Sequence, residues 1–400
     1  MIPLSGNERI KIGLVVPEAP QYSETFFNYK IKGLQESGFE VIVFSNKKKN
    51  SKNNFENVPA FPVYNRKKIR QFFLFTGIIF YTFITSPLRA NKLFSYERKD
   101  GKSVYKSLKT VYINAHILKH DLDWLHFGFT TMALKRENTA KAMDAKMGVS
   151  FRGFDINVYP LKHKGAYNKV WERVDKVHSI SDYLRDKAVK LGLPENKPYE
   201  KITPAIDISL FKLKDDLGKI HTPLRILTIG RLNWIKDNET SISAMKILKE
   251  KGIDFIFKIV GDGKESERLK YAVHQSGLDD KIIFLGKLSH MEISEVMNQS
   301  DIYLQTSLQE GFCVSVLEAQ ASGLLCVVSD AEGLKENVQN SSTGWIVKRR
   351  DANAFADKII EVINLPEDKR TVTALNARKR VESDFTIEDQ KIKFRNFFTA

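Results

Sequence analysis

Residues 302–330 constrain the fold of this chain more than any other stretch, because they predict a strand, a helix and a second strand in direct succession. The apolar runs at 302–304 and 325–328 have the length of short buried strands. Between them, apolar residues recur at helical spacing until Gly323, a residue type that ends helices. A helix between two buried strands is typical of a βαβ unit in an α/β protein.

Two glutamates accompany the predicted helix, Glu310 in the loop before it and Glu318 inside it. The backbone amides of residues 311–315 lie at the start of this helix, where N–H groups lack intrahelical acceptors and attract anions. A carboxylate beside an anion site suits a ligand that presents a sugar diol next to a phosphate. The residues alone leave a second interpretation open, an ordinary crossover with two solvated glutamates.

The segment EGFCVSVLE resembles the signature of the retaining glycosyltransferases of the GT-B fold. This large family, numbered four in the usual classification, includes bacterial polysaccharide and lipid-linked sugar transferases. Its pattern is E-G-F-G, four residues, then E-A, with two glutamates eight apart, as Glu310 and Glu318 are here. Cys313 replaces the usual glycine, and Leu325-Cys326 stands where Pro-Val is usual. Because cysteine is small, we expect a tighter loop and a retained site.

The chain has 400 residues, enough for two α/β domains, and the resemblance implies two doubly wound, Rossmann-like domains that face across a cleft. We predict an N-terminal acceptor-side domain over 1–205, a C-terminal donor domain over 206–385 and a last helix over 386–400 that crosses back to the first domain. The opening βαβ pattern lacks G-x-G-x-x-G, so no dinucleotide cofactor is expected. Strands are predicted at 10–16, 39–45, 174–180, 224–229, 255–260, 282–285 and 301–305, and a polar loop at 46–58.

The pattern G-R-L-x-x-x-K follows a predicted strand and contains Arg231 and Lys236. The resemblance implies that these two cations grip the donor diphosphate. A departing nucleoside diphosphate gains negative charge, and without a metal two cations and a helix N-terminus must stabilise it. Either residue alone would be interpreted as a surface cation. Three matching segments, GRLNWIK, VGDG and EGFCVSVLE, make that interpretation improbable.

The resemblance also assigns roles at the donor. Glu318 is expected to accept both ribose hydroxyls, Glu310 to lie near the donor sugar, and the backbone at 287–288 to border the base. Retaining members are thought to lack an enzymic nucleophile, so no general base is named. The predicted catalytic residues are Glu310, Arg231, Lys236 and Asp155. The predicted donor-binding residues are Gly230, Arg231, Lys236, Gly261, Lys287, Leu288, Glu310, Gly311, Phe312, Cys313, Val314 and Glu318.

Two segments of the first domain carry the predicted acceptor side. Many relatives have H-G-x-D near the transferred sugar, and this chain keeps Asp155 but has Arg152 in place of the histidine. Arg152 either meets an anionic donor or acceptor group or is structural. The loop Ser23-Glu24-Thr25 resembles one that faces the cleft in polysaccharide-building members. A helix cap by Ser23 or Thr25 explains this loop equally well.

We expect neither a metal nor a cofactor. The D-x-D motif at 121–123 precedes a predicted strand, whereas the metal-binding D-x-D of the other main glycosyltransferase fold follows one. The two cysteines give no disulfide framework, which is typical of a reducing compartment. The N-terminus lacks the pattern of a secretory signal. These features predict a cytoplasmic protein.

The positive charge lies in the first half of the chain. Residues 1–205 contain 35 Lys and Arg against 19 Asp and Glu, and residues 206–400 contain 28 against 29. An anionic partner is therefore expected, such as the inner face of the cell membrane, a phosphorylated lipid or an acidic glycan. No nucleic-acid-binding motif is present, so nucleic acid is not expected.

An aromatic, apolar run at 72–84 is too short to span a bilayer, which needs about 20 residues. Arg66, Lys67, Lys68 and Arg70 precede it, and Arg89 follows it. A buried or half-buried helix is slightly favoured. An interfacial helix that attaches the protein peripherally to a membrane is the alternative.

We therefore predict a retaining, metal-independent glycosyltransferase. It would move a sugar from a nucleotide-diphosphate donor to a glycan or lipid-linked acceptor in cell-surface polysaccharide synthesis. The alternative functions are a non-catalytic sugar-nucleotide-binding protein and a phosphorylase-like or epimerase-like protein of the same fold.

Overall fold

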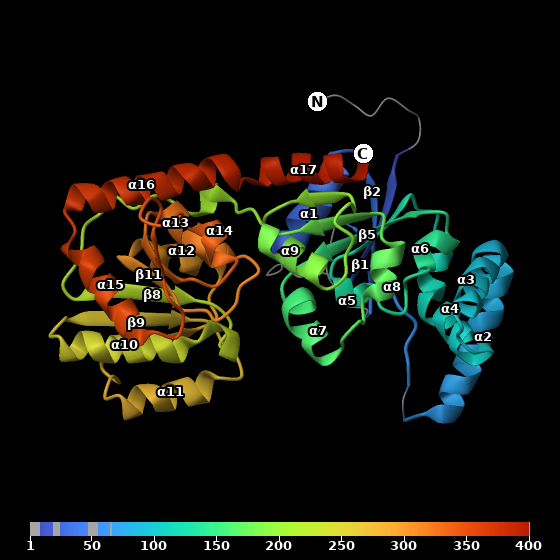
Figure 1. Ribbon diagram of the computed structural model, residues 1–400, viewed down its shortest axis with the longest axis horizontal. Coiled ribbons are helices and arrows are strands. Elements are labelled where there is room, and N and C mark those ends of the chain that lie inside the picture. Colours follow the sequence, from blue (N-terminus) through green and yellow to red (C-terminus); the bar gives the residue numbers. More distant parts are fainter. Residues whose placement is uncertain (1–8, 19–24, 47–54, 65, 400) are drawn as a thin grey trace. The chain divides into compact units, whose positions relative to one another are not determined.

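The computed structural model describes residues 9–18, 25–46, 55–64 and 66–399 (Figure 1). The chain forms two compact units. The first unit contains residues 1–202 together with 390–400, and the second contains residues 203–389. These divisions differ by a few residues from the predicted boundaries at 205 and 385. In each unit, helices pack against a parallel β-sheet.

The first unit is built on a seven-stranded parallel sheet of order β3-β2-β1-β4-β5-β6-β7. All strands are parallel, but successive strands are added on one side of β1 up to β3 and on its other side from β4 onward, as in a doubly wound fold. Its edge strand β3 corrects the predicted loop at 46–58, because Glu56 onward pairs with β2 although the segment is polar. The strands are β1 (Lys11–Val16), β2 (Glu40–Ser45), β3 (Glu56–Pro59), β4 (Trp124–Phe127), β5 (Lys146–Phe151), β6 (Lys176–Ser179) and β7 (Tyr199–Lys201).

Helices of very different lengths connect these strands. Ser181 caps α9 (Asp182–Lys190), because its side chain accepts a hydrogen bond from the Leu184 amide. The C-terminal helix α17 (Ile387–Thr399) belongs to the first unit from residue 390, and Phe394, Phe397 and Phe398 join the core beside Trp124. The other helices are α1 (Thr25–Glu36), α2 (Lys68–Thr85), α3 (Pro87–Lys99), α4 (Val104–Leu118), α5 (Thr130–Ala133), α6 (Thr139–Ala142), the π-helical turn η1 (Phe154–Val158), α7 (Tyr159–Lys162), α8 (Asn168–Arg173) and α9 (Asp182–Lys190).

The predicted buried or half-buried helix at 72–84 is half-buried in α2, with one face packed and the other exposed. Only Ile78 and Thr82 of its side chains are buried. The sequence period could show that a helix forms, but not that it packs on α4 and α3, beside which it lies in Figure 1, and leaves six large apolar side chains exposed. No single helix of the described residues is long and apolar enough to cross a membrane. Helices α2 and α3 meet that test of length and composition only as a pair, bent by 117°.

The second unit has a six-stranded parallel sheet of order β10-β9-β8-β11-β12-β13. The order in which strands are added to this sheet changes side between β8 and β11. In open α/β sheets the crevice at such a switch point, at the carboxyl ends of the strands, is where ligands bind. The strands are β8 (Leu224–Ile229), β9 (Phe255–Val260), β10 (Ile282–Gly286), β11 (Ile302–Gln305), β12 (Leu325–Ser329) and β13 (Trp345–Val347), so the predicted strands at 224–229 and 255–260 are confirmed.

The helices of the second unit begin and end at residues that the sequence marks. Ser289 and Glu292 form a capping box at the start of α12, and the predicted helix end at Gly323 is the end of α13, with a φ of 83°. Asp351 caps α15 through the Ala354 amide. The helices are η2 (Ile208–Leu210), η3 (Trp234–Lys236), α10 (Asn238–Glu250), α11 (Ser266–Gln275), α12 (His290–Asn298), α13 (Val314–Ser322), α14 (Leu334–Asn337), α15 (Ala352–Asn364) and α16 (Glu367–Asp384).

Candidate active site

An ion pair lies at the switch point of the second unit. Lys236 comes from the loop after β8 and Glu310 from the loop after β11, and their side chains meet with 2.6 Å between Nζ and Oε1. Both side chains are largely buried, with 16% and 13% of their surface exposed. Burial alone would lower the pKa of Lys236, but the Glu310 carboxylate outweighs it and raises that pKa above its ordinary value. The ammonium is therefore charged at neutral pH.

A buried hydrogen-bond network holds Glu310 from the other side. Ser307 Oγ donates to Glu310 Oε1 at 2.8 Å, and Gln305 Nε2 donates to Ser307 Oγ at 2.6 Å. Tyr303 continues the network to Gln305 and Ser315. Sequence reasoning missed these residues. Part of their signal was present, because Tyr303 and Gln305 alternate with the apolar residues Ile302 and Leu304 at the period of a strand.

Arg231 lies in the same loop as Lys236 and is exposed. Within the described part of the chain, its side chain has neither a hydrogen bond nor an ion pair. The positive charge of Arg231 opposes the effect of Glu310 and lowers the pKa of Lys236 by a smaller amount. The two predicted cations are therefore close neighbours. The site therefore holds one cation that is engaged by a carboxylate and one that has no partner.

Backbone segments approach closely around these cations. A side chain at Gly261 would place its Cβ 1.9 Å from the Gly230 carbonyl oxygen, and one at Gly263 would meet the Leu232 oxygen at 2.1 Å. The Gly261 amide donates to the Gly286 oxygen at 2.7 Å. Glycine is therefore required here by contact, because any Cβ would force the ends of β8 and β9 apart.

The first turn of α13 lies next to the pair. Cys313 precedes the helix, and its amide donates to Asn337 Oδ1 at 2.9 Å, so that amide is occupied. The following amides, of Val314 and Ser315, begin the helix and lack intrahelical acceptors. Burial raises the pKa of the Cys313 thiol, which stays protonated. Cys313 thus fills the space of the usual glycine as a small, neutral side chain.

Glu318 lies one turn along α13 from Val314 and is 9% exposed. Burial raises the pKa of its carboxyl to about 7. Among the described residues, no group donates a hydrogen bond to this carboxylate. A buried carboxylate without a donor is costly for the fold, and this cost favours a ligand that supplies the missing donors.

The remaining donor-site candidates surround this centre in the second unit. Lys287 is exposed and lies 3.6 Å from Asp262, and Leu288 beside it is half-buried. Gly311 follows Glu310, whose carbonyl accepts the Gly333 amide at 3.1 Å. Phe312 is buried against Phe385, with 5.6 Å between ring centroids. All twelve predicted donor-binding residues therefore belong to the second unit, and their role stays a prediction.

The candidates in the first unit have a different setting. Asp155 is fully buried and accepts hydrogen bonds from the amides of Arg152, Gly153 and Thr130, at 2.9 to 3.0 Å. Its carboxylate thus holds the turn after β5, and its place among the catalytic residues stays a prediction. Of the predicted loop residues, Ser23 and Glu24 lie outside the described residues. Thr25 begins α1, and its side chain is not described.

Arg152 stacks on the ring of Phe26, with 3.4 Å from its guanidinium carbon to the ring centroid. Its Nε and Nη2 groups are buried without a hydrogen-bond acceptor. Burial lowers the pKa of Arg152 to about 9, against the opposing effect of Asp155. The ring contact supports the structural interpretation of Arg152, and the unused N–H groups leave the anion-binding interpretation open.

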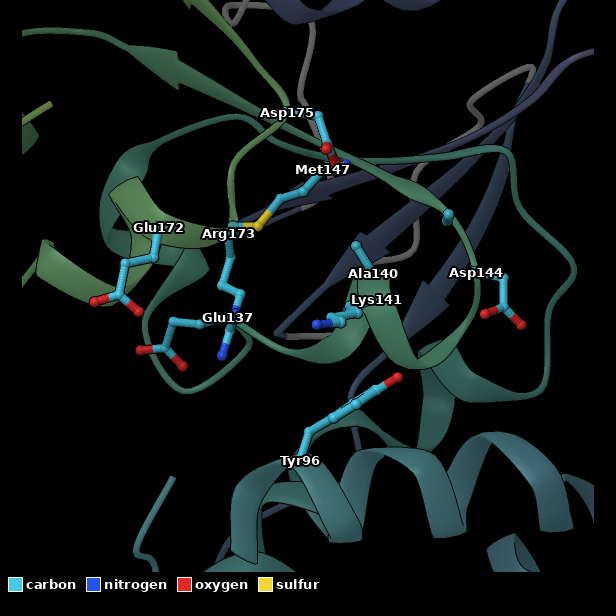
Figure 2. A pocket seen from close by; sticks show the side chains of 10 residues that line it. Tyr96, Glu137, Ala140, Lys141, Asp144, Met147, Glu172, Arg173 and Asp175 are labelled. Carbon is cyan, nitrogen blue, oxygen red and sulfur yellow. Dashed lines mark hydrogen bonds between the residues drawn. The ribbon is translucent and has the colours of Figure 1, made fainter. Parts of the chain in front are cut away.

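A larger pocket of about 530 Å³ opens at the amino ends of β5 and β6, lined by Glu137, Lys141 and Arg173 (Figure 2). None of the predicted site residues lines it. Ligands of open α/β sheets bind at the carboxyl ends of strands. The candidate active site is instead the smaller crevice lined by Gly230, Lys236 and Gln305.

The D-x-D motif is part of the loop into β4, as its position predicted. Asp121 pairs with Arg89 at 2.7 Å, and Asp123 accepts the Lys11 amide at 2.7 Å. Both carboxylates are therefore used within the fold. Among residues 9–18, 25–46, 55–64 and 66–399, no three or more His, Cys, Asp or Glu side chains form a group that could hold a metal ion.

Comparison with known proteins connects this site to a family. The model of the family "Glycosyl transferases group 1" matches residues 211–380. The amylovoran biosynthesis glycosyltransferase AmsK of Erwinia amylovora is 30% identical, over 69% of this chain and 68% of its own length. The putative colanic acid biosynthesis glycosyltransferase WcaL of Escherichia coli K12 is 28% identical, over 65% of this chain and 66% of its own.

Solved structures match over nearly the whole chain. The crystal structure of Anabaena Alr3699/HepE in complex with UDP-glucose superposes with a TM-score of 0.71 at 15% identity, covering 98% of this chain and all of that one. At such low identity the match shows the fold alone. The shared fold is two Rossmann-like α/β units, and the family match falls on the unit that carries Arg231, Lys236, Glu310 and Glu318.

Proposed function

Because this chain belongs to the glycosyl transferases group 1 and has the GT-B fold, we propose that it is a retaining enzyme with a nucleoside-diphosphate sugar as donor. As a member of this family the chain is a glycosyltransferase. We propose a glycan or lipid-linked acceptor in the synthesis of a cell-surface polysaccharide. The names of its relatives, in amylovoran and colanic acid biosynthesis, support this proposal. Its two cysteines are free thiols, which supports a cytoplasmic location.

The arrangement of Lys236, Glu310 and Arg231 carries this proposal. A cation with a raised pKa, a second cation whose side chain has no partner among the described residues and the open first turn of α13 lie close to one another at the switch point. Together they suit a diphosphate, which has several oxygens to be bound and gains charge when it leaves. Arginine offers a fork of donors and lysine a compact charge, so the two can bind different phosphate oxygens.

Glu318 supplies the second half of the proposed donor site. A ribose presents two neighbouring hydroxyl donors, and the Glu318 carboxylate is a buried acceptor without a donor. Binding of the ribose would therefore relieve a cost that is present in the free protein. Glu310 is held rigidly by Lys236 and Ser307, which suits a group that faces the donor sugar, where positive charge develops.

The proposed reaction needs no enzymic nucleophile. The bond between the sugar C1 and the phosphate oxygen breaks, and the acceptor oxygen bonds to C1 on the same face. The acceptor proton passes to the departing phosphate oxygen. Arg231, Lys236 and the amides of Val314 and Ser315 stabilise the diphosphate as it leaves, and Glu310 stabilises the positive sugar. No cofactor takes part in this proposal.

The test of this function is a panel of sugar nucleotides, beginning with UDP-sugars, incubated with the protein and with acceptor lipids or glycans. We expect release of the nucleoside diphosphate with one donor and transfer with retained anomeric configuration, read by NMR. Orthophosphate-dependent release of a sugar phosphate would favour a phosphorylase, and an altered sugar on the intact nucleotide would favour an epimerase. Binding of sugar nucleotides without any turnover would favour the non-catalytic alternative.

Metal independence is a separate prediction. Because Arg231, Lys236 and a helix N-terminus can neutralise the leaving diphosphate, activity should persist in EDTA. The measurement is the initial rate of transfer before and after chelation, with a known metal-dependent glycosyltransferase treated in parallel as control. Loss of activity that Mg²⁺ or Mn²⁺ restores would contradict the prediction.

A further inference from the structure

Helix α2 presents an apolar stripe to solvent. Its side chains follow helical spacing and lie on the face away from α4, and each exposes at least half of its surface. Phe72, Phe73 and Phe80 are 62%, 68% and 69% exposed. The six members of this α2 stripe are Ile69, Phe72, Phe73, Phe80, Tyr81 and Ile84. Soluble surfaces rarely show so many large apolar side chains together, so the stripe marks an interaction surface.

The opposite face of α2 shows that the exposure is specific to one side. Ile78 is buried, and Phe75 packs against Tyr112 of α4 with 5.3 Å between ring centroids. The Tyr112 hydroxyl donates to the Pro62 carbonyl oxygen at 2.6 Å and ties α4 to the segment before α2. The helix is therefore anchored by one face, and the stripe is held rigidly outward.

Two threonine hydroxyls on the exposed part of α2 form hydrogen bonds within the helix. Thr76 Oγ1 donates to the carbonyl oxygens of Phe72 and Phe73, both at 3.1 Å. Thr85 Oγ1 donates to the Tyr81 carbonyl oxygen at 2.9 Å. These two hydroxyls need no water, so they can enter an apolar phase without losing hydrogen bonds.

The charges around the stripe select the partner. Between Glu56 and Glu97 the chain has no acidic residue. Arg66, Lys67 and Lys68 are exposed at the start of α2 and, within the described residues, pair with no other group. Cations beside a row of aromatic side chains fit the interface of an anionic bilayer, where the rings enter the acyl boundary and the cations meet lipid phosphates.

We propose that α2 is an interfacial membrane-docking helix, which lies flat on an anionic lipid bilayer and inserts the α2 stripe. It lies in the membrane plane rather than across it, because its inner face is covered by α4. This inference deepens the proposed function, since it names the surface on which a lipid-linked acceptor is met. The binding itself does not depend on the transferase activity.

Co-sedimentation with vesicles tests this docking without any sugar donor. The wild-type protein should bind vesicles of phosphatidylethanolamine with phosphatidylglycerol at low salt and should not bind phosphatidylcholine alone. Arg66→Gln/Lys67→Gln/Lys68→Gln should weaken binding on the order of a hundredfold, because each cation near an anionic leaflet contributes about a fivefold factor. The control Lys246→Gln/Lys369→Gln/Lys379→Gln, on exposed cations of the second unit, should bind like the wild type.

A second set of variants tests the contribution of the apolar α2 stripe to membrane binding. Phe72→Ser/Phe73→Ser/Phe80→Ser should abolish the binding that survives high salt and leave the fold intact, since the three rings are exposed. The matched control Tyr271→Ser/Val372→Ser/Leu375→Ser removes exposed apolar side chains of the second unit and should change nothing. Phe80→Trp should be quenched by lipids brominated on their acyl chains, whereas Tyr271→Trp should not.

Two results would overturn the docking proposal. In the first, the wild type remains in the supernatant with anionic vesicles at low salt. In the second, light scattering shows a dimer that the serine triple variant of the stripe converts to a monomer, so that a second copy of the chain covers the stripe. Either result leaves the donor-panel test of transferase activity unaffected, and a failed donor panel leaves the vesicle result unaffected.

Discussion

Lys236→Ala should lower kcat/KM at least about a hundredfold, because loss of one preorganised donor to a leaving group costs about that much. The structure adds a second effect. Lys236 neutralises Glu310, and both side chains are largely buried. Its removal leaves the carboxylate without its cation, which should lower the free energy of unfolding by on the order of 3 kcal/mol. Transfer kinetics and denaturant unfolding measure the two effects separately.

Two further variants separate catalysis from stability. Arg231→Ala should lose activity to a similar degree but keep its unfolding free energy within about 0.5 kcal/mol, because Arg231 is exposed and has no partner in the described part of the chain. The double variant Lys236→Ala/Glu310→Gln should regain stability and stay inactive. Normal turnover in a folded Arg231→Ala/Lys236→Ala protein would refute the donor site.

Glu318→Gln should stabilise the free protein above about pH 7 and weaken donor binding. The folded pKa of Glu318 is raised to about 7 from an ordinary value of 4.5, so burial destabilises the ionised form. The cost is absent below about pH 4.5, where both folded and unfolded states are protonated, and it is complete above about pH 7. The variant should therefore exceed the wild type by about 3 kcal/mol in unfolding free energy near pH 8, and by much less near pH 5.

Donor binding should show the opposite effect of the same carboxyl. Ribose hydroxyls donate to the ionised form, so wild-type affinity should fall up to about tenfold for each pH unit below about 7. In Glu318→Gln this dependence should vanish, and affinity near pH 8 should be lower by about 1.5–3 kcal/mol. Calorimetry with an intact sugar nucleotide measures both, since its diphosphate diester does not titrate in this range.

A structural role for Glu318 predicts different data. The wild type and Glu318→Gln would then bind the donor equally at every pH, while stability still changed. Gln320, two residues along the same helix, offers a control, because its amide donates to the Thr343 carbonyl oxygen inside the fold. Gln320→Ala should lower stability without changing the pH dependence of donor binding.

The residues of the candidate site were largely predictable from the sequence, but the contacts between their side chains were not. Spacing and residue type pointed to Arg231, Lys236, Glu310 and Glu318. That Lys236 and Glu310 form a pair depends on β8 and β11 lying side by side, although 74 residues separate the two side chains. That Glu318 lacks a donor depends on everything packed around α13. Such facts follow from contacts distant in sequence, which local patterns do not encode.

The polar residues in and after β11 also show what local sequence patterns can and cannot predict. Tyr303 and Gln305 lie on one face of β11, which could have been seen in the sequence, and Ser307 follows in the loop after the strand. Their function as a support for Glu310 arises only when Ser307 Oγ comes within 2.8 Å of Glu310. The sequence could suggest a polar face, but the loop geometry decided what this face holds.

The sequence by itself determined the α/β class, the repeated strand–helix pattern, the glycine end of α13 and the identity of the phosphate-binding candidates. These features depend on local backbone preference and on side-chain period, which are encoded within a few residues. Only the tertiary structure decided that β3 joins the first sheet and that α2 has a bare apolar face. Both depend on which partner a segment finds, because an apolar run forms the same helix whether its second face meets protein or solvent. Exposure is a property of the whole fold, so the α2 stripe was recognisable only once α4 was seen to cover one side and nothing in the described chain to cover the other.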